Sequence, residues 1–303
     1  MKKATEVKYP HSANLFQFCR RVLDHKFGGI RVIDQDVGQI LGFDPADCSH
    51  WKKGKKNIRS IQAMKSIAEH LGVDEKLVVD VASGDIEENE AFFEYSGYGV
   101  FRIDPKVFES AKKDFYRKHA GDWSKEKEGE FRDFFDIDEP TIDQAVTEIH
   151  EKLNFREAPL YLPEIVTTFP DVSLVGTAAN DSISEATPVA ATKSGNDTVI
   201  NYIAGAEMRP FMRYRIAKAL AGHFLPEGFI SGDDEDEYKR HLSDVRSNLF
   251  AAKLLAPADL VRKEMGQVNV ARDIVSQLAE VFWVSKTFMN RRLKEILESN
   301  AAK

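Results

Sequence analysis

Apolar residues between positions 14 and 81 recur at the three- and four-residue spacing of short amphipathic helices. Four segments carry the pattern, with glycine or polar residues between them: LFQFCRRVL, VGQILGF, ADCSHWKKG and IQAMKSIAEHLGV. Short helices joined by tight turns bury their apolar stripes against one another. The pattern therefore predicts a compact helical domain over residues 1–83.

Residues 84–140 differ in character because charged residues dominate them, with 16 acidic and 9 basic side chains. One helical pattern runs from about Pro105 to His119. We expect a charged connector with one or two exposed helices, partly mobile. Its two aromatic runs, FFEYSGYGVF and FRDFFDI, are where we expect two copies of the chain to meet.

Residues 141–303 mix helical and strand patterns and predict a second domain. TIDQAVTEIHEKLNF and YLPEIVTTFP read as helices, and three short segments rich in Val, Thr and Ile read as strands: VSLVGTA, TPVAATKS and DTVINYIAG. Three further helical patterns follow: PFMRYRIAKALAGHFL, DVRSNLFAAKLLAP and DIVSQLAEVFWVSKTFMNRRLKEILES. The predicted fold class is mainly α with a small β-sheet.

Composition is typical of a globular protein and argues against membrane-spanning and secreted proteins. No apolar run approaches the roughly 20 residues of a membrane span, and the first ten residues lack the apolar stretch of a signal peptide, so we expect a cytoplasmic protein without membrane partners. The only two cysteines, Cys19 and Cys48, are expected to be reduced core residues. Residues 1–80 carry a net charge of +4 and the remainder −11, which favours a polyanionic partner for the front.

The segment from Asp34 to Asn57 has the layout of a helix-turn-helix. Its first helix turns Val37, Ile40 and Leu41 inward, and Gly42 permits a tight turn. The second helix is capped by Asp44-Pro45 and turns Cys48 and Trp51 inward. The expected DNA-contacting residues are Gln35, Ala46, Asp47, Ser49, His50, Lys52, Lys53, Lys55, Lys56 and Asn57. Lysines at the end of such a helix can neutralise phosphates on either side of a groove.

This segment resembles the Xre/Cro family of repressors over about sixty residues. The matching motifs are Val37-Gly38, Leu41-Gly42, Cys48-x-x-Trp51-x-x-Gly54 and Ala68-x-x-Leu71-Gly72-Val73. Three residues depart from what the family pattern suggests. Asp34, with Gln35 after it, stands where the family usually has Gln, and Lys52 follows the Trp where an acidic residue is usual. Asp47 is acidic where DNA is expected. The resemblance implies sequence-specific binding to double-stranded DNA, with a base preference that no relative supplies.

The rear of the chain resembles the ImmA/IrrE metallopeptidase domain over roughly 150 residues. The family's Glu-Ala-Asn-x-Phe-Ala-Ala helix corresponds to RSNLFAAKLLAP, and its Leu-Ala-x-x-Phe-x-Val-Ser helix corresponds to LAEVFWVSKTFMNRRL. In register are Asn248, Phe250, Ala251, Ala252, Leu255, Pro257, Leu278, Ala279, Phe282, Val284, Ser285, Arg292 and Leu293. The family's zinc helix corresponds to RYRIAKALAGHFL.

The family's zinc chemistry does not carry over to this chain. Lys218 stands at the first histidine position, Ala219 at the catalytic glutamate, Gly222 at the second histidine and Arg246 at the downstream glutamate ligand. A cation at a ligand position repels a divalent ion. His223 has no histidine four residues before it, so it makes no metal-binding pair. We therefore expect a folded pseudopeptidase domain that is not an enzyme and binds no metal or cofactor.

Three roles remain open for such a domain. It can serve as a sensor or dimerisation module that takes a small anionic or peptide effector, or as an interaction platform for another regulator or a phage protein. The least favoured role is a residual metallopeptidase that recruits its metal ligands from His223, His241 and the carboxylates of residues 233–237. If these carboxylates bind no metal, we expect them to form a solvated loop. Because Lys218 and Arg246 occupy positions that touch one ion in the family, we expect them to converge on one volume and to hold an anion.

Taken together, the sequence predicts a dimeric, cytoplasmic, DNA-binding transcriptional regulator, a repressor in preference to an activator. The predicted organisation is a helix-turn-helix domain over 1–83, a charged helical connector over 84–140 and an ImmA/IrrE-like pseudopeptidase or sensor domain over 141–303.

Overall fold

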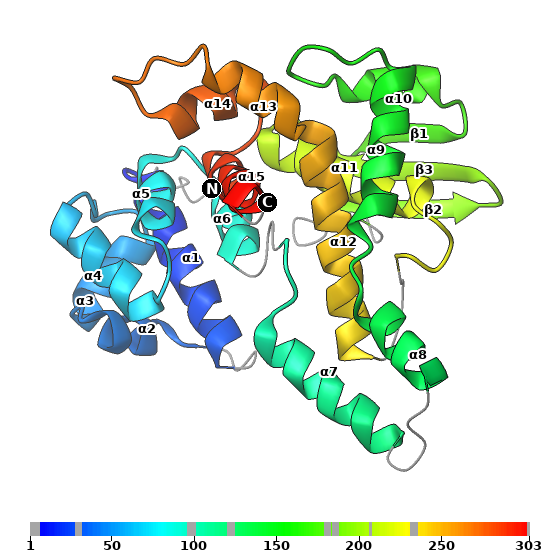
Figure 1. Cartoon of the computed structure of the whole chain (residues 1–303). Helices are drawn as coiled ribbons and strands as arrows, with labels where there is room; N and C mark the ends of the chain where they lie inside the picture. Colours follow the sequence, from blue (N-terminus) through cyan, green and yellow to red (C-terminus); the bar gives the residue numbers. More distant parts are fainter. Residues whose placement is uncertain are drawn as a thin grey trace. The chain divides into compact units, whose positions relative to one another are not determined.

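The computed structural model describes residues 7–27, 32–95, 101–119, 125–178, 183, 188–205, 208–230 and 236–301. Contacts divide the chain into two compact units, a front unit over Met1–Tyr98 and a rear unit over Gly99–Lys303 (Figure 1). Most of the chain is helical, and one small three-stranded mixed sheet lies in the rear unit, which confirms the predicted mainly α class with a small sheet.

The front unit is a helical bundle built around its first helix. Its elements are α1 (Pro10–Lys26), α2 (Asp34–Leu41), α3 (Pro45–Lys52), α4 (Ile61–Leu71), α5 (Glu75–Ser83) and α6 (Glu88–Tyr95). The helix α1 contacts each of the other five. It turns Leu15, Phe18 and Val22 into the core, at the spacing that places side chains on one helical face. The bundle therefore extends past residue 83, because α6 packs on α1.

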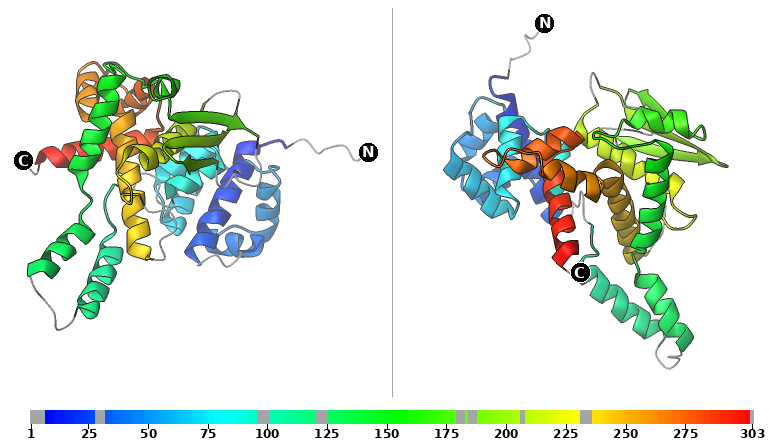
Figure 2. Two further views of the ribbon diagram at one scale, coloured as in Figure 1. Left: turned by 90° about the vertical axis from the view of Figure 1, so that its right-hand side faces the viewer. Right: turned by 45° about the horizontal axis from the view of Figure 1, so that its top comes forward.

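The rear unit contains the remaining helices and the sheet. Its elements are α7 (Pro105–Lys118), α8 (Lys125–Phe135), α9 (Glu139–Lys152), α10 (Leu162–Thr168), β1 (Val172–Thr177), β2 (Val189–Ser194), β3 (Asp197–Ile203), α11 (Pro210–Phe224), α12 (Glu237–Leu255), α13 (Ala258–Met265), α14 (Ile274–Phe282) and α15 (Lys286–Ala301). The helices α7 and α8 belong to this unit, since α7 contacts α12. They lie side by side in both views of Figure 2.

The three strands form one sheet in the order β1-β3-β2. β1 pairs with β3 in parallel, with Val172 opposite Thr198, and β2 pairs with β3 in antiparallel, with Val189 opposite Tyr202. The helix α11 packs against β2 and β3 on one side and against α12 on the other. The sheet and α12 thus hold α11, the helix that carries the zinc-helix resemblance, from two sides.

Two expectations about single features of the chain can be compared with the structure. Cys19 and Cys48 are free thiols, and both are buried, as predicted. Burial raises the pKa of the Cys19 thiol, so it stays protonated near neutral pH. Among the described residues, no helix is both long enough and apolar enough to cross a bilayer.

Candidate functional site

The turn between α2 and α3 has the geometry that the sequence predicts. Gly42 adopts a left-handed conformation with φ of 73°, which a side chain would disfavour. The Phe43 amide then donates to the Gly38 carbonyl at 2.8 Å. Asp44 caps α3, since its Oδ1 accepts from the Ala46 amide at 2.8 Å and Pro45 follows as the first helical residue. These contacts fix the direction in which α3 leaves α2.

Close packing holds α3 against α2 and α1. A Cβ at Gly38 would lie only 2.9 Å from the Cys48 sulfur, so a side chain there would push the two helices apart. Trp51 is fully buried, and its Nε1 donates to the Ser12 carbonyl of α1 at 2.5 Å. Its ring packs against Phe16 and Phe43. The inward residues of α3 are therefore anchored, and its opposite face is held in a fixed orientation.

The opposite face of α3 carries the predicted reading residues. Ala46 and His50 are exposed, while Asp47 and Ser49 are half-buried. The Asp47 carboxylate pairs with the Lys56 ammonium at 2.5 Å. An isolated carboxylate on this face would repel DNA phosphates, and the pairing offsets that repulsion. The acidic residue that departs from the family pattern is thus neutralised by a lysine of the next loop.

The four predicted phosphate-binding lysines differ in whether a carboxylate of the described residues contacts them. Lys52 contacts Asp34 at 2.7 Å, and Lys56 contacts Asp47 as described. Lys53 and Lys55 are exposed, and no carboxylate of the described part of the chain pairs with them. Lys53 and Lys55 are therefore the lysines whose charge is available to a polyanion.

Two further predicted contact residues, Gln35 and Asn57, lie at the edges of this surface. Gln35 is exposed near the start of α2. Asn57 is also exposed, and its Oδ1 accepts from the Ser12 hydroxyl at 3.2 Å. That hydrogen bond ties the loop after α3 to α1, so Asn57 also has a structural role.

The structure adds two cations that the sequence reasoning missed, Lys8 and Arg59, both exposed. The Tyr9 amide donates to the Gly54 carbonyl at 2.8 Å, which brings Lys8 to the loop that carries Lys53 and Lys55. Gly54 has φ of 58°, and a Cβ there would lie 2.3 Å from Val7 Cγ1. Only glycine at position 54 allows Val7 to lie this close. No pattern in the sequence predicted the contact between the chain start and the loop after α3.

In the rear unit, Lys218 on α11 pairs with Asp244 of α12 through a 2.8 Å contact. Burial lowers the pKa of the Lys218 ammonium, and the Asp244 carboxylate opposes that shift. Ala219 is half-buried and Gly222 is exposed, and a Cβ added at Gly222 would meet no atom within 4 Å. The three positions of α11 that the resemblance aligns with a zinc helix thus hold one paired cation, Lys218, and two small residues that offer no ligand atom.

Arg246, the remaining position that the resemblance aligns with a zinc ligand, is held by backbone carbonyls. Its guanidinium donates to the carbonyls of Asp136, Ile137 and Phe229 at 2.8, 3.2 and 3.1 Å, and it lies 4.0 Å above the Phe229 ring. Burial lowers the pKa of this guanidinium.

Lys218 and Arg246 therefore hold separate acceptors, in place of the one shared anion that we expected. Asp244 and Arg246 are two residues apart on α12, so their side chains leave different sides of the helix. A carboxylate of this chain does hold Lys218, whereas Arg246 turns to the connection between α8 and α9.

A zinc ion does not fit the residues that the structure describes. In the part of the chain that the structure describes, no three His, Cys, Asp or Glu side chains are grouped to hold a metal. His223 Nδ1 lies 2.9 Å from Thr198 Oγ1 and its Nε2 lies 3.3 Å from Asp171, while His241 Nε2 accepts from the Asp104 amide. Residues 233–235 lie outside the described residues, and Asp236 caps α12.

The aromatic runs expected at a dimer contact are distributed over both units. Phe92 and Tyr95 pack against His25 of α1, Phe101 is buried against Phe288, and residues 96–100 lie outside the described residues. The second run forms a cluster in which Phe115, Phe131, Phe134, Phe135 and Tyr238 contact one another. None of the four phenylalanines is fully buried.

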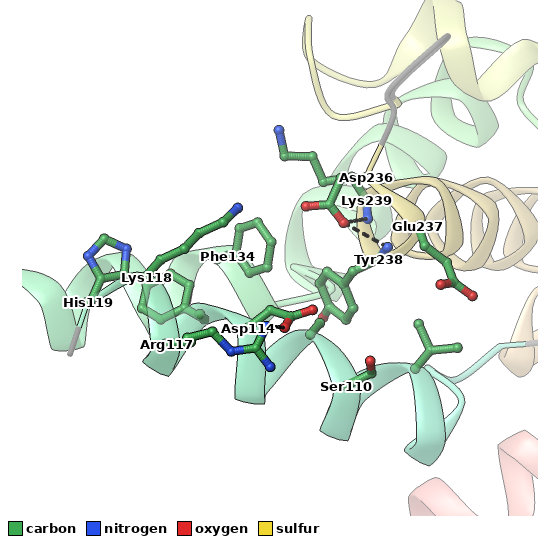
Figure 3. Close-up of a pocket in the computed structure, with 13 residues that line it drawn as sticks. Ser110, Asp114, Arg117, Lys118, His119, Phe134, Asp236, Glu237, Tyr238 and Lys239 are labelled. Atoms are coloured by element: carbon green, nitrogen blue, oxygen red, sulfur yellow. Dashed lines mark hydrogen bonds and ion pairs between the residues drawn. The ribbon is translucent and has the colours of Figure 1, made fainter.

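A cleft of about 760 Å³ adjoins this cluster between α7 and the start of α12. Figure 3 shows the rings of Phe134 and Tyr238 at its centre, with charged side chains of both signs around them. Among the charged lining residues, Arg117 contacts Asp114 at 3.1 Å. The cleft combines aromatic rings with charged side chains of both signs.

Comparisons with known proteins give no identification, because no protein-family model, curated protein or solved structure matches this chain.

Proposed function

We propose that this protein is a sequence-specific transcriptional regulator that binds duplex DNA through the outward face of α3. The observation that carries the proposal is the difference among the four lysines. Lys53 and Lys55 are exposed and, among the described residues, have no carboxylate partner, and they lie beside a helix whose inward face is fixed by Trp51. A rigid helix with small and polar outward residues suits a major groove, and unpaired lysines at its end suit the flanking phosphates.

The proposed roles divide the surface into a reading part and a positioning part. Ala46, Ser49 and His50 face base edges, and Asp47 does so as half of an ion pair with Lys56. Lys53 and Lys55 neutralise phosphates together with Lys8 and Arg59, which are also exposed. A helix of eight residues buries too little surface to be specific alone, so the active form in this proposal is a homodimer.

The rear unit in this proposal is a metal-free module that senses an effector or binds a partner. The contacts of Lys218 and Arg246 support this role over zinc chemistry, because both positions place a held cation where the family has a ligand. An anionic effector at Lys218 would have to displace the Asp244 carboxylate. Because Asp244 is largely exposed, such an exchange requires little rearrangement.

The test is enrichment of binding sequences from a random duplex library with the full chain. We expect a defined motif with two related half-sites, as a two-fold dimer requires. Recovery of unselected sequence after repeated rounds would refute DNA reading. Metal analysis of the same preparation should show less than one zinc per ten chains, whereas one tightly held zinc per chain would overturn the assignment of the rear unit.

A further inference from the structure

The cleft between α7 and the start of α12 has the size of a small-molecule site. Its volume is about 760 Å³, and ligand pockets of proteins hold roughly 300–1,000 Å³. Its lining residues come from α7, α8, the start of α12 and the residues next to these helices, all within the rear unit. The cleft therefore belongs to one unit of the chain.

The apolar side of α7 faces this cleft and not a core. Val107, Ala111 and Phe115 stand four residues apart, so they lie on one face of the helix, and all three line the cleft. They are half-buried, and no residue of α7 is fully buried. The helix thus leaves its apolar stripe partly accessible, and a ligand in the cleft would cover it.

Phe134 of α8 provides the accessible aromatic surface of the cleft. Its ring stacks on Tyr238, with centroids 5.2 Å apart and planes inclined by 24°, and it lies 5.7 Å from the Phe115 ring. Tyr238 is only 2% exposed, and its hydroxyl donates to the Phe135 carbonyl at 3.3 Å. Because Tyr238 is buried and Phe134 is half-buried, a planar ligand would meet Phe134.

The carboxylates that line the cleft leave one end open to an anion. Asp114 contacts Arg117 at 3.1 Å, and Asp236 caps α12 by accepting from two backbone amides at 2.9 and 3.4 Å. Glu237 is exposed, and Figure 3 shows it at the opposite end of the cleft from Lys118. Two of the carboxylates are therefore engaged within the chain, and the third lies away from Lys118.

Lys118 supplies a positive charge that no carboxylate of the described residues contacts. It is exposed, and Figure 3 shows its side chain reaching from α7 toward the Phe134 ring. His119 follows on the same side of that ring, and its own ring lies 4.6 Å from that of Phe115. An ammonium and an imidazole N–H beside an aromatic surface suit a ligand that joins a ring to an acidic group.

We propose that this cleft binds a small aromatic acid, with the ring against Phe134 and the acidic group at Lys118 and His119. The site is separate from Lys218 and Arg246, neither of which lines the cleft. Binding of the acid does not depend on DNA. Its role as the effector that the rear unit senses rests on the proposed function.

The experiment titrates the full chain with two fluorescent probes that differ in one acidic group. The probes are anilinonaphthalene sulfonate and its uncharged analogue phenylnaphthylamine, which has the same rings without the sulfonate. Lys118→Gln removes the charge, and its control is Lys113→Gln, because Lys113 is an exposed lysine of α7 that does not line the cleft. Phe134→Leu removes the ring, and its control is Phe131→Leu, in the same aromatic cluster but outside the cleft. Thermal unfolding of each variant confirms that it is folded.

We expect one molecule of the sulfonate per chain, bound about 5-fold or more tightly than the uncharged probe. Lys118→Gln should remove that preference and leave binding of the uncharged probe unchanged. Phe134→Leu should weaken binding of both probes by about 3- to 10-fold.

Sulfonate binding that Lys118→Gln weakens no more than Lys113→Gln overturns the inference, as does binding that Phe134→Leu weakens no more than Phe131→Leu. Sulfonate binding that declines as the chain concentration rises would show that a second copy covers the cleft, which also overturns it. The titrations contain no DNA, so a chain that binds the sulfonate as expected and enriches no DNA motif keeps this site and loses the proposed function. A chain that reads DNA and binds no sulfonate loses this site alone.

Discussion

The cations of the two units differ in what holds them. Lys53 and Lys55, after α3, are exposed without a carboxylate partner in the described part of the chain. In the rear unit, Arg213 is buried and donates to the carbonyls of Leu160 and Trp283 at 2.9 and 3.0 Å. Arg246 is likewise held by three carbonyls.

This difference shows that a positive charge indicates a partner only when its own chain leaves it unsatisfied. A guanidinium surrounded by carbonyls stabilises the fold, and burial lowers the pKa of the Arg213 group to about 10. An exposed lysine contributes little to folding and keeps its charge for a ligand. Removing a held cation should therefore reduce stability, and removing an unpaired one should reduce binding.

The largest effect is expected from Arg213→Met, which leaves the Leu160 and Trp283 carbonyls without a donor and removes the contact with the Trp283 ring. The free energy of unfolding should fall by about 3 kcal/mol or more, measured by urea denaturation. The control is Arg262→Met, which removes an exposed pair with Asp259 and should cost less than about 1 kcal/mol. Equal losses in both variants would remove the distinction between a buried cation held by carbonyls and a cation in an exposed pair.

The next effect concerns DNA affinity, in the variant with both Lys53→Ala and Lys55→Ala. Affinity for every duplex should fall roughly 10-fold or more at physiological salt, and the slope of log K against log salt should become shallower by about 2. Stability should change by less than about 0.5 kcal/mol. Lys106→Ala with Lys113→Ala, two exposed lysines of α7, has the same change in charge and should leave both quantities near wild type. The same loss of affinity in that control would show a nonspecific effect of net charge.

A smaller effect is expected at the Asp47–Lys56 pair, because Lys56 is held by a carboxylate but is only half-buried. Asp47→Asn removes a negative charge from the reading face and should raise affinity for all sequences by about 3-fold, while Lys56→Ala leaves Asp47 unbalanced and should lower it. Fluorescence anisotropy with a labelled duplex measures both. A change in the same direction for both variants would show that the pair does not act through its charge.

The smallest effect is a pH dependence of stability from two histidines of the rear unit. Burial lowers the pKa of His150 below its ordinary value of 6.5, although its contact with the Leu254 carbonyl opposes the shift, and burial also lowers that of His223. The unfolded chain therefore binds more protons than the folded chain, so stability falls as the pH drops past 6.5.

Thermal unfolding between pH 8 and pH 5 measures this dependence. His150→Gln, whose amide can still donate to the Leu254 carbonyl, should flatten it without changing stability at pH 8 by more than about 1 kcal/mol. An unchanged profile in this variant would remove His150 from the account.

Local features of the fold could be predicted because they depend on neighbouring residues. Apolar spacing placed α1 to α4, and Gly42 with Asp44-Pro45 placed the turn before α3. The three strands were also predicted in the regions where they lie. Each of these depends on steric limits or hydrogen bonds within a few residues.

Contacts between distant residues could not be predicted in the same way. The approach of Lys8 to the loop after α3 depends on a hydrogen bond between Tyr9 and Gly54, and Asp244 could equally have faced solvent. The division into units at residue 98 follows from the packing of α6 on α1. The sequence did not indicate this packing, because the charged composition of α6 is typical of a connector. Net charge per segment also gave no indication of which lysines are paired.

The most direct measurement of whether α3 enters a DNA groove is cleavage of the enriched duplex by an iron chelate attached at position 50. In the variant His50→Cys, the new thiol is exposed whereas Cys19 and Cys48 are buried, so the chelate attaches at one place. The account predicts cleavage confined to the motif. Bound DNA that stays intact beside the chelate at position 50, or that is cleaved without regard to the motif, would contradict it.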